Sequence, residues 1–314
     1  MQRHTQITAR VIDRLKLKQL RLLIAVDRHR SILHAARELN LSQPAATKMI
    51  KDLELDFEVD LFERSNRGVT PTASGAALIQ GARLIFSQVA GTAQEIEDLS
   101  GGRAGRIVVG TLLAASSQLL PLAIERALST RPRLAIKVVE GTNEMLMPRL
   151  RAGELDLVVG RLPVRRYRSD LAQRRLFDDR IDLVVRRGHA LLSLEAPTFD
   201  DLRGYGWILP PPETTLRRQI DQYFISEGQY VPPQVVESVS FLTNRALLTA
   251  TDMICALPSR VVAVDGADGL DALPLALPFG NGPVGASYRQ STSLPPAAEA
   301  FLKALEDVAS ELTS

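Results

Sequence analysis

The chain has 314 residues, which is enough for two or three domains with sizeable cores. With 45% hydrophobic and 24% charged residues, its composition is typical of a soluble globular protein and excludes a fibrous or disordered chain. The net charge of +2 is unevenly placed, because residues 1–51 carry 11 Lys/Arg against three acidic residues. This basic segment on a mildly acidic body predicts that one end of the chain meets a polyanion.

The sequence holds one cysteine, Cys255, which excludes an internal disulfide. Cys255 lies in an apolar run, so we expect a buried structural thiol. No metal-ligand spacing such as CxxC or HExxH occurs, so we expect no metal and no cofactor. The first ten residues are polar, and no apolar run approaches a membrane span. We therefore expect a cytoplasmic protein with no membrane contact.

The N-terminal pattern predicts helices packed around a tight turn. Helical apolar spacing over residues 16–29 predicts a first helix, and residues 31–53 read as two further helices. Asn40 and Leu41 break the pattern between those two helices. Ser42 can cap the second of them, and Pro44 suits its first turn. The segment has the signature of a helix-turn-helix.

The second helix of this pair has two faces. Ala46, Ile50 and Leu53 share a buried stripe with Met49, whereas the opposite face is polar. Amide, hydroxyl and ammonium groups on one exposed face suit base edges and phosphates. The residues predicted to contact DNA here are Ser42, Gln43, Thr47, Lys48 and Lys51. The alternative is an ordinary amphipathic hairpin whose charges meet only water.

Two short extended pieces follow, at residues 61–62 and 69–70, with a turn over residues 65–68. Arg64 and Arg67 flank this turn. A small β-wing carrying two arginines beside a recognition helix would grip the adjacent DNA backbone, so both arginines are predicted DNA contacts.

Thr72 is the predicted cap of a long helix over residues 73–99, which would extend ~40 Å. Its apolar stripe has too little neighbouring chain to cover it. Either the C-terminal body packs on the stripe or a second copy does, and the second option makes a dimer that reads two half-sites. Residues 100–105, rich in glycine, read as a hinge.

From residue 106 strands and helices alternate, which predicts a βαβαβ arrangement with a mostly parallel sheet. The run Leu155-Asp-Leu-Val-Val159 is echoed by Ile181-Asp-Leu-Val-Val185, and a second α/β set follows. Extended pieces at residues 273–277 and 286–291 are expected to return to the first set. Two similar lobes joined by crossing strands leave a cleft, and ligands bind there at the carboxyl ends of the strands.

Strand-to-helix corners supply the candidate ligand contacts in this cleft. Ser116 and Ser117 can offer a hydroxyl to a ligand or merely cap a helix. Arg161 suits a carboxylate or sugar hydroxyls, the alternative being a salt bridge across the lobes. Glu213 favours either the helix dipole or sugar hydroxyls. The predicted effector-binding residues are Ser116, Ser117, Thr142, Asn143, Arg161, Glu213, Thr214 and Thr215.

No nucleophile–base set with defensible geometry emerges, so an enzyme is not expected. Asp156 and Asp182 begin the repeated strands, away from the ligand edge, and are expected to be solvated or to pair with a strand edge. His189 is expected to be a surface histidine.

The chain resembles the LysR-type transcriptional regulators over essentially its whole length. The most specific stretches are Leu39-Asn-Leu-Ser-Gln-Pro-Ala45, Leu61-Phe-Glu-Arg-Ser-Asn-Arg-Gly-Val69, and Thr72 with Gly75. Residues 207–218 further resemble the subgroup of the galactose-binding-protein regulator. The chain departs from the family pattern at three places, one of which is Ala250-Thr-Asp252, where the family has Gly-Leu-Gly before the late strand. Leu33 replaces a common Thr or Ser, and Glu58 stands where Gly is usual, at a cost of about 1 kcal/mol if positive φ is needed there.

The resemblance implies three parts: a winged helix-turn-helix (residues 1–72), a long linker helix with a hinge (73–105), and a two-lobed, periplasmic-binding-protein-like effector domain (106–314). We expect residues 106–162 with 267–314 in one lobe and 163–266 in the other. It also implies promoter DNA, a small effector, a linker-helix dimer or tetramer and RNA polymerase as partners, and effector contacts at Thr142 and Arg161.

We therefore expect a DNA-binding transcriptional regulator whose promoter contacts are controlled by a sugar or a small organic acid. The alternatives are a small-molecule-binding protein without DNA function and an α/β enzyme.

Overall fold

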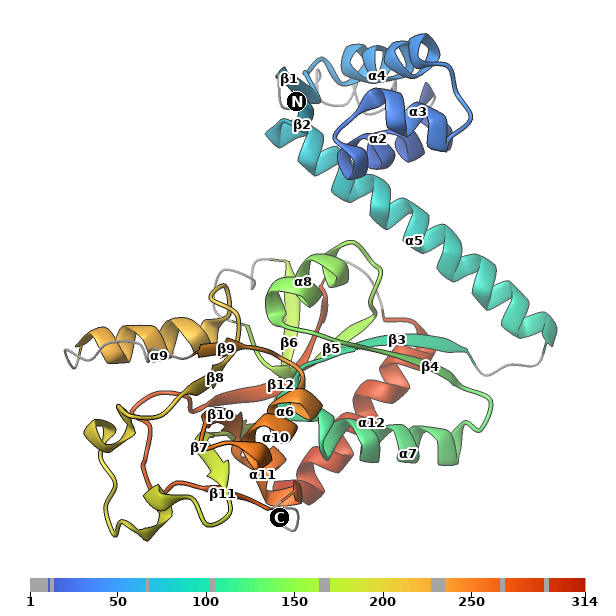
Figure 1. The fold of residues 1–314 in the computed structure, drawn as a ribbon. Helices are drawn as coiled ribbons and strands as arrows, with labels where there is room; N and C mark the ends of the chain where they lie inside the picture. Colours follow the sequence, from blue (N-terminus) through green and yellow to red (C-terminus); the bar gives the residue numbers. More distant parts are fainter. Residues whose placement is uncertain are drawn as a thin grey trace. The chain divides into compact units, whose positions relative to one another are not determined.

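The computed structural model describes residues 11, 14–65, 68–101, 105–163, 170–226, 235–265, 269–290 and 294–313. Within it the chain forms two compact units, residues 1–93 and 94–314. The first is helical with a two-stranded wing, and the second is an α/β structure with two five-stranded sheets (Figure 1). None of the described helices is long and apolar enough to cross a membrane.

The N-terminal unit is a winged helix-turn-helix, as the sequence predicted. Its elements are α2 (Leu17–His29), α3 (Ile32–Glu38), α4 (Gln43–Phe57), β1 (Phe62–Ser65), β2 (Gly68–Pro71) and the start of α5 (Ala73–Gly101). The two strands pair antiparallel with Phe62 opposite Pro71. Leu23, Ile50 and Leu61 lie in one buried cluster, so the apolar faces of the helices and the wing share a core.

Local chemistry sets where these helices begin and end. The Ser42 hydroxyl accepts a hydrogen bond from the Ala45 amide (3.3 Å), and Ser31 caps α3 in the same way through the His34 amide. Asn40 lies in the left-handed region, at φ 53°, in the turn between α3 and α4. Glu58 ends α4 at φ 57°, a conformation that favours glycine. The expected strain at Glu58 is therefore present.

Two backbone amides in and next to the wing donate hydrogen bonds that join it to the helices. The Val69 amide donates to the Arg30 carbonyl oxygen (3.0 Å), and the Leu61 amide donates to Glu54 Oε1 (3.0 Å). Gly68 has φ 115°, and a Cβ there would lie 2.8 Å from the Arg30 carbonyl oxygen. Only glycine therefore permits this close approach of β2 to the α2–α3 turn.

The long helix α5 begins where predicted, because the Thr72 hydroxyl accepts from the Gly75 amide (3.0 Å). Gly75 passes against the chain before the wing, where a Cβ would lie 1.9 Å from the Leu61 carbonyl oxygen. Farther along, Ile85 and Val89 expose apolar side chains.

In the C-terminal unit, the first lobe holds a mixed sheet of order β4-β3-β5-β12-β6. Its strands are β3 (Arg106–Thr111), β4 (Ala135–Glu140), β5 (Leu157–Arg161), β6 (Leu171–Asp179) and β12 (Gly282–Arg289), and its helices are α6 (Leu113–Ser116), α7 (Leu119–Thr130), α8 (Asn143–Arg151) and α12 (Pro296–Thr313). β3, β4 and β5 are parallel, as predicted, whereas β12 runs antiparallel to both of its neighbours.

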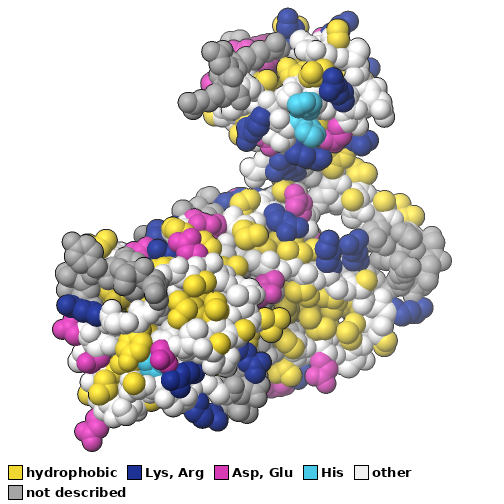
Figure 2. Space-filling view, in the orientation of Figure 1, with side chains coloured by type: hydrophobic (Ala, Val, Ile, Leu, Met, Phe, Trp, Pro, Cys, Tyr) yellow, Lys and Arg dark blue, Asp and Glu magenta, His cyan; other side chains and the backbone are white. Residues whose placement is uncertain are grey.

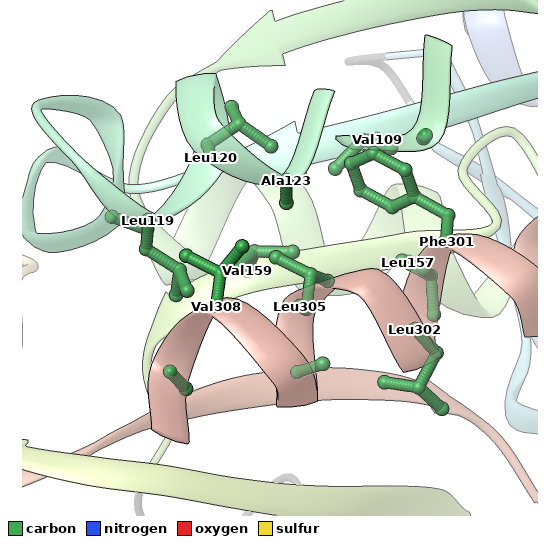
Figure 3. Close-up of a cluster of buried hydrophobic side chains, with 14 of the residues drawn as sticks. Val109, Leu119, Leu120, Ala123, Leu157, Val159, Phe301, Leu302, Leu305 and Val308 are labelled. Carbon is green, nitrogen blue, oxygen red and sulfur yellow. The ribbon is translucent and has the colours of Figure 1, made fainter. Parts of the chain in front are cut away.

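Figure 3 shows the core of this lobe, where Leu119 and Ala123 from α7 meet Phe301 and Leu305 from α12 beside Val159 of β5. The opposite face of the sheet is covered by α8 through Leu146 and Leu150. Helices on both faces explain why the inner parallel strands β3 and β5 are rich in apolar residues. At roughly 25 cal/mol per Å², this burial is a main stabilising contribution to the lobe.

The second lobe holds a sheet of order β11-β7-β10-β8-β9. Its elements are β7 (Ile181–Arg186), β8 (Trp207–Leu209), β9 (Val235–Glu237), β10 (Ile254–Pro258), β11 (Leu270–Ala272), α9 (Thr215–Ser226), α10 (Phe241–Ala250), α11 (Ser259–Asp265) and the short 3₁₀ turns at Ala190–Ser193 and Phe199–Leu202. β8 is parallel to β9 and β10, and β7 is antiparallel to β10.

Strand pairing differs from the expected division between the lobes. β6 falls within residues 163–266 but pairs with β12 in the first sheet, and β11 falls within 267–314 but pairs with β7 in the second. The expectation that residues 273–277 return to the first set was wrong, because Leu273, Leu275 and Leu277 pack in the core of the second lobe. Apolar patterning alone does not tell which of two similar sheets a strand joins.

Candidate DNA-binding surface and effector cleft

The polar face of α4 is exposed. Ser42, Gln43, Lys48 and Lys51 are exposed, and Thr47 is half-buried. Neither lysine forms an ion pair with any residue in the described part of the chain, so both ammonium groups are available to an external anion. Figure 2 shows further Lys and Arg side chains spread over the visible face of the N-terminal unit. This arrangement is suited to phosphate binding with an amide and a hydroxyl beside it.

The wing contributes less that can be described. The Arg64 backbone pairs with Val69 in the β1–β2 ladder, one residue from the close end of the hairpin. Arg67, predicted to contact DNA, lies outside the described residues.

In the C-terminal unit a cleft of about 700 Å³ is lined by both lobes. First-lobe residues reach it from the ends of β3, β4 and β5 and from the helices that follow, and second-lobe residues reach it from the ends of β8 and β10 and from α9 and α10. The cleft therefore lies at the carboxyl ends of the strands, where the sequence predicted it. Seven of the eight predicted effector-binding residues line the cleft: Ser116, Ser117, Thr142, Asn143, Arg161, Thr214 and Thr215.

The first-lobe hydroxyls are not helix caps. The Ser116 hydroxyl donates to the Leu112 carbonyl oxygen (3.2 Å), one turn back. Ser117 Oγ is buried and has no hydrogen-bond partner among the described residues. Thr142 precedes α8 without a side-chain cap bond. The capping alternative for Ser116 and Ser117 was therefore wrong, since α7 begins after Gln118.

Arg161 lies at the joint between the lobes. Its Nη1 donates to the Gly280 carbonyl oxygen (2.6 Å) and its Nη2 to the Asp179 carbonyl oxygen (3.2 Å). Burial lowers the pKa of the guanidinium, and Asp179 and Asp178 oppose this shift. Arg161 thus holds both segments that cross between the sheets, and two of its donors are already used.

In the second lobe, the Thr214 hydroxyl donates to the Pro211 carbonyl oxygen (2.8 Å) and accepts from the Arg217 amide (3.3 Å). Thr215 Oγ1 accepts from Arg218 Nη2 (3.2 Å). Glu213 is exposed and does not line the cleft, so the structure does not bring it together with the other candidates.

Two cleft features were missed by the sequence reasoning. Asn244, in the first turn of α10, is buried in the cleft wall. Asn244 lies in the helix that follows β9, as Asn143 lies in the helix that follows β4, but at a different position of the helix. Glu144 also lines the cleft and pairs across the lobes with Arg218 (3.9 Å), a contact that no sequence pattern predicts.

The environments of one histidine and two aspartates can be compared with the environments that the sequence predicted. His189 is 2% exposed and packs against the Tyr205 ring (4.7 Å between centroids), so the expectation of a surface histidine was wrong. Asp156 Oδ2 accepts from the Val108 amide (2.8 Å), the predicted pairing with a strand edge, and burial raises its pKa. Asp182 pairs with Arg180 (3.0 Å).

Cys255 is buried, as predicted, and desolvation raises the pKa of its thiol to about 12. Within the described ranges, no group of three or more His, Cys, Asp or Glu side chains is placed to hold a metal ion.

Comparison with known proteins follows the same division of the chain. Residues 17–76 match the family model for the bacterial regulatory helix-turn-helix protein, lysR family, and residues 100–310 match the LysR substrate binding domain. The chain is 34% identical to the HTH-type transcriptional regulator GbpR of Azospirillum brasilense, over 93% of this chain and 86% of that protein.

It is 32% identical to the HTH-type transcriptional regulator PcaQ of Agrobacterium fabrum, over 96% of this chain and 97% of the relative. Among solved structures, it shares its fold with CbnR, a LysR family transcriptional regulator, at a TM-score of 0.62 and 21% identity, covering 94% of this chain and 99% of that one. With a matching helix-turn-helix, a matching effector domain and full-length relatives, the chain belongs to the LysR family of transcriptional regulators.

Proposed function

We propose that this LysR-type regulator binds specific promoter sites through α4 and the wing, and that a small effector in the interlobe cleft controls those contacts. The effector is a sugar or a small organic acid. One observation carries the proposal: a single chain combines a polar face on α4, whose two lysines form no ion pair with the described residues, with a cleft of about 700 Å³ lined by two lobes. In this proposal residues 1–72 bind DNA, residues 73–105 connect the DNA-binding and effector domains, and residues 106–314 bind the effector.

On the DNA side, Gln43 and Thr47 read base edges, because an amide and a hydroxyl can donate and accept in the major groove. Lys48 and Lys51 bind phosphates, as do Ser42 at the helix start and the two wing arginines, Arg64 and Arg67. Leu33, exposed on α3, offers no hydrogen bond to a phosphate.

On the effector side, Ser117, Thr142 and Asn143 from the first lobe face Thr214 and Thr215 from the second across the cleft. Ser116 and Arg161 support the first-lobe wall and the crossing segments. A ligand held by both lobes stabilises one interlobe angle over others, and that differential affinity is the source of control.

The functional assembly is a dimer formed through α5, and two dimers make a tetramer. Exposed Ile85 and Val89 on α5 are apolar side chains that a second copy would cover. Two copies present two recognition helices to two half-sites. The assembly works in the cytoplasm beside RNA polymerase and carries out no catalytic step.

The test is a gel-shift titration with the DNA upstream of this protein's own gene. The folded, full-length protein should retard this DNA more strongly than random DNA at the same salt concentration. No retardation at low salt, by protein that is folded and dimeric, would contradict the proposal. A thermal-shift screen with sugars and organic acids then tests the cleft, because a ligand that binds only the folded state raises the melting temperature.

A further inference from the structure

We infer that the effector is an uncharged ring compound that donates hydroxyl hydrogen bonds to both walls of the cleft, one to Asn143 Oδ1 and one to Asn244 Oδ1. This inference rests on the proposed effector-binding function. It disfavours an ionised acid as the effector and favours a neutral ring with hydroxyl groups, either a sugar or a phenol. It also adds Asn244 to the residues that contact the ligand.

Unsatisfied acceptors are the first observation. Among the described residues six buried side-chain atoms have no hydrogen-bond partner, and three of them, Asn143 Oδ1, Asn244 Oδ1 and Ser117 Oγ, belong to residues that line the cleft. Asn143 is only 9% exposed and Asn244 only 3%. Buried polar groups are nearly always hydrogen-bonded, so their convergence on one cleft indicates a missing partner.

The chemistry of these atoms defines that partner. The Asn143 Nδ2 donates to the Arg161 carbonyl oxygen (3.1 Å), which fixes which end of the amide is the oxygen. An amide oxygen only accepts, so the ligand group that meets it must be a donor. A ligand hydroxyl fits this requirement, whereas an ionised carboxylate, which only accepts, does not.

Charge in the cleft points the same way. Among its described lining residues the charged side chains are Glu140, Glu144 and Arg161. Arg161 already donates to two carbonyl oxygens of the crossing segments. Glu144 pairs with Arg218 (3.9 Å), so a carboxylate ligand would meet the carboxylate of Glu140, an already paired Glu144 and a guanidinium that is partly used. The charged side chains of the cleft therefore offer an anion little stabilisation.

The apolar residues that line the cleft are suited to contact the flat face of a ring compound. Ile208, Leu257 and Phe241 contribute apolar surface to the same cleft. A pyranose and a phenol both combine a flat apolar face with hydroxyl groups on the ring edge. Asn143 belongs to the first lobe and Asn244 to the second, so one ligand that satisfies both acceptors also bridges the lobes.

The experiment compares matched pairs of probes on the full-length protein by thermal shift and calorimetry. The pairs are D-galactose with D-galacturonate, D-glucose with D-glucuronate, and catechol with 3,4-dihydroxybenzoate. We expect an uncharged member of at least one pair to raise the melting temperature and to bind about tenfold more tightly than its carboxylate partner. The first two pairs report a sugar and the third a phenol.

Tighter binding of the carboxylate member, or no shift with any uncharged probe, would overturn the inference. Asn244→Leu should weaken the uncharged probe about tenfold, roughly the effect of one lost hydrogen bond. Asn244→Thr keeps an acceptor oxygen without adding a buried charge and should bind the probe more tightly than Asn244→Leu. If Thr weakens binding as much as Leu does, Asn244 is not an acceptor for the ligand.

Ser117→Ala is the second variant should Asn244→Leu unfold, and it should weaken binding about fivefold. Each variant is also tested by gel shift without any probe, and retention of DNA binding shows an intact protein. A wild-type protein that binds DNA but shows no preference for the uncharged probe overturns only this inference, whereas absence of DNA binding by the wild type overturns the proposed function.

Discussion

The α4 surface and the interlobe cleft use similar polar residues in opposite states. On α4 the side chains of Gln43, Lys48 and Lys51 are exposed, and the lysines have no ion partner in the described chain. In the cleft, Arg161, Ser116 and Thr214 already bond to backbone carbonyl oxygens. On α4, a side chain is a candidate for ligand contact because it is exposed. In the cleft, a side chain is a candidate because one of its polar atoms has no hydrogen-bond partner.

We expect the largest loss of stability from substituting Arg161, whose guanidinium bonds to two backbone carbonyl oxygens. Arg161→Ala leaves the Gly280 and Asp179 carbonyl oxygens without their donor, and should lower the free energy of unfolding of the C-terminal unit by about 3 kcal/mol. Urea unfolding measures it. Arg126→Ala, which removes only a surface pair with Glu311, should cost less than about 0.5 kcal/mol. Equal effects would mean that Arg161 is not structurally engaged.

On the exposed surface the effect should appear in binding rather than in stability. Gln43→Ala should weaken binding to the specific DNA site by about 2 kcal/mol, roughly 30-fold, because a base contact is lost, with little change on random DNA. Lys51→Ala should weaken both and reduce the slope of log K against log salt by about one unit. Competition gel shifts at several salt concentrations measure both. Equal loss on both DNAs for Gln43→Ala would exclude base reading.

A smaller effect concerns the end of the recognition helix. Glu58→Gly should raise the free energy of unfolding of the N-terminal unit by about 1 kcal/mol, because glycine adopts φ 57° without strain. Glu63→Gly, in the regular β1 strand, should lower it instead. Thermal unfolding of both variants gives the sign. A destabilised Glu58→Gly would show that the Glu58 side chain contributes more than its backbone costs.

The smallest effect concerns the rate at which the Cys255 thiol is alkylated. Since desolvation raises the Cys255 pKa to about 12, the thiol stays protonated at pH 8 and should react with iodoacetamide far more slowly in the folded protein than in urea. Mass spectrometry over time measures the labelling. Similar rates in both states would mean that the cleft floor opens readily.

The N-terminal unit was largely predictable because its signals are local. Ser42 caps a helix three residues away, and the buried stripe through Ala46 and Ile50 follows from helical spacing. The α/β alternation was equally visible. The assignment of β6 and β11 to sheets was not, because pairing with β12 or β7 depends on residues about 100 positions apart or on a choice between similar strands.

The position of the cleft could be predicted from the sequence, but the hydrogen bonds formed by its residues could not. The ends of the strands placed Thr142, Asn143 and Arg161 at one edge. Only three-dimensional contacts reveal that Arg161 already forms hydrogen bonds and that Glu213 does not line the cleft. His189 was missed for the same reason, since its burial comes from Tyr205 and from the chain near Asp252.

The two bonds that hold the wing have a consequence for the DNA that one copy can read. Val69 is bound to Arg30 at the end of α2, and Leu61 is bound to Glu54 of α4, so the wing base is fixed to the helices at two points. The distance between α4 and the wing is therefore fixed. In the proposed mode of DNA binding, one copy would not accommodate an extra base pair within its half-site, and differences in operator length would be taken up between copies of the protein.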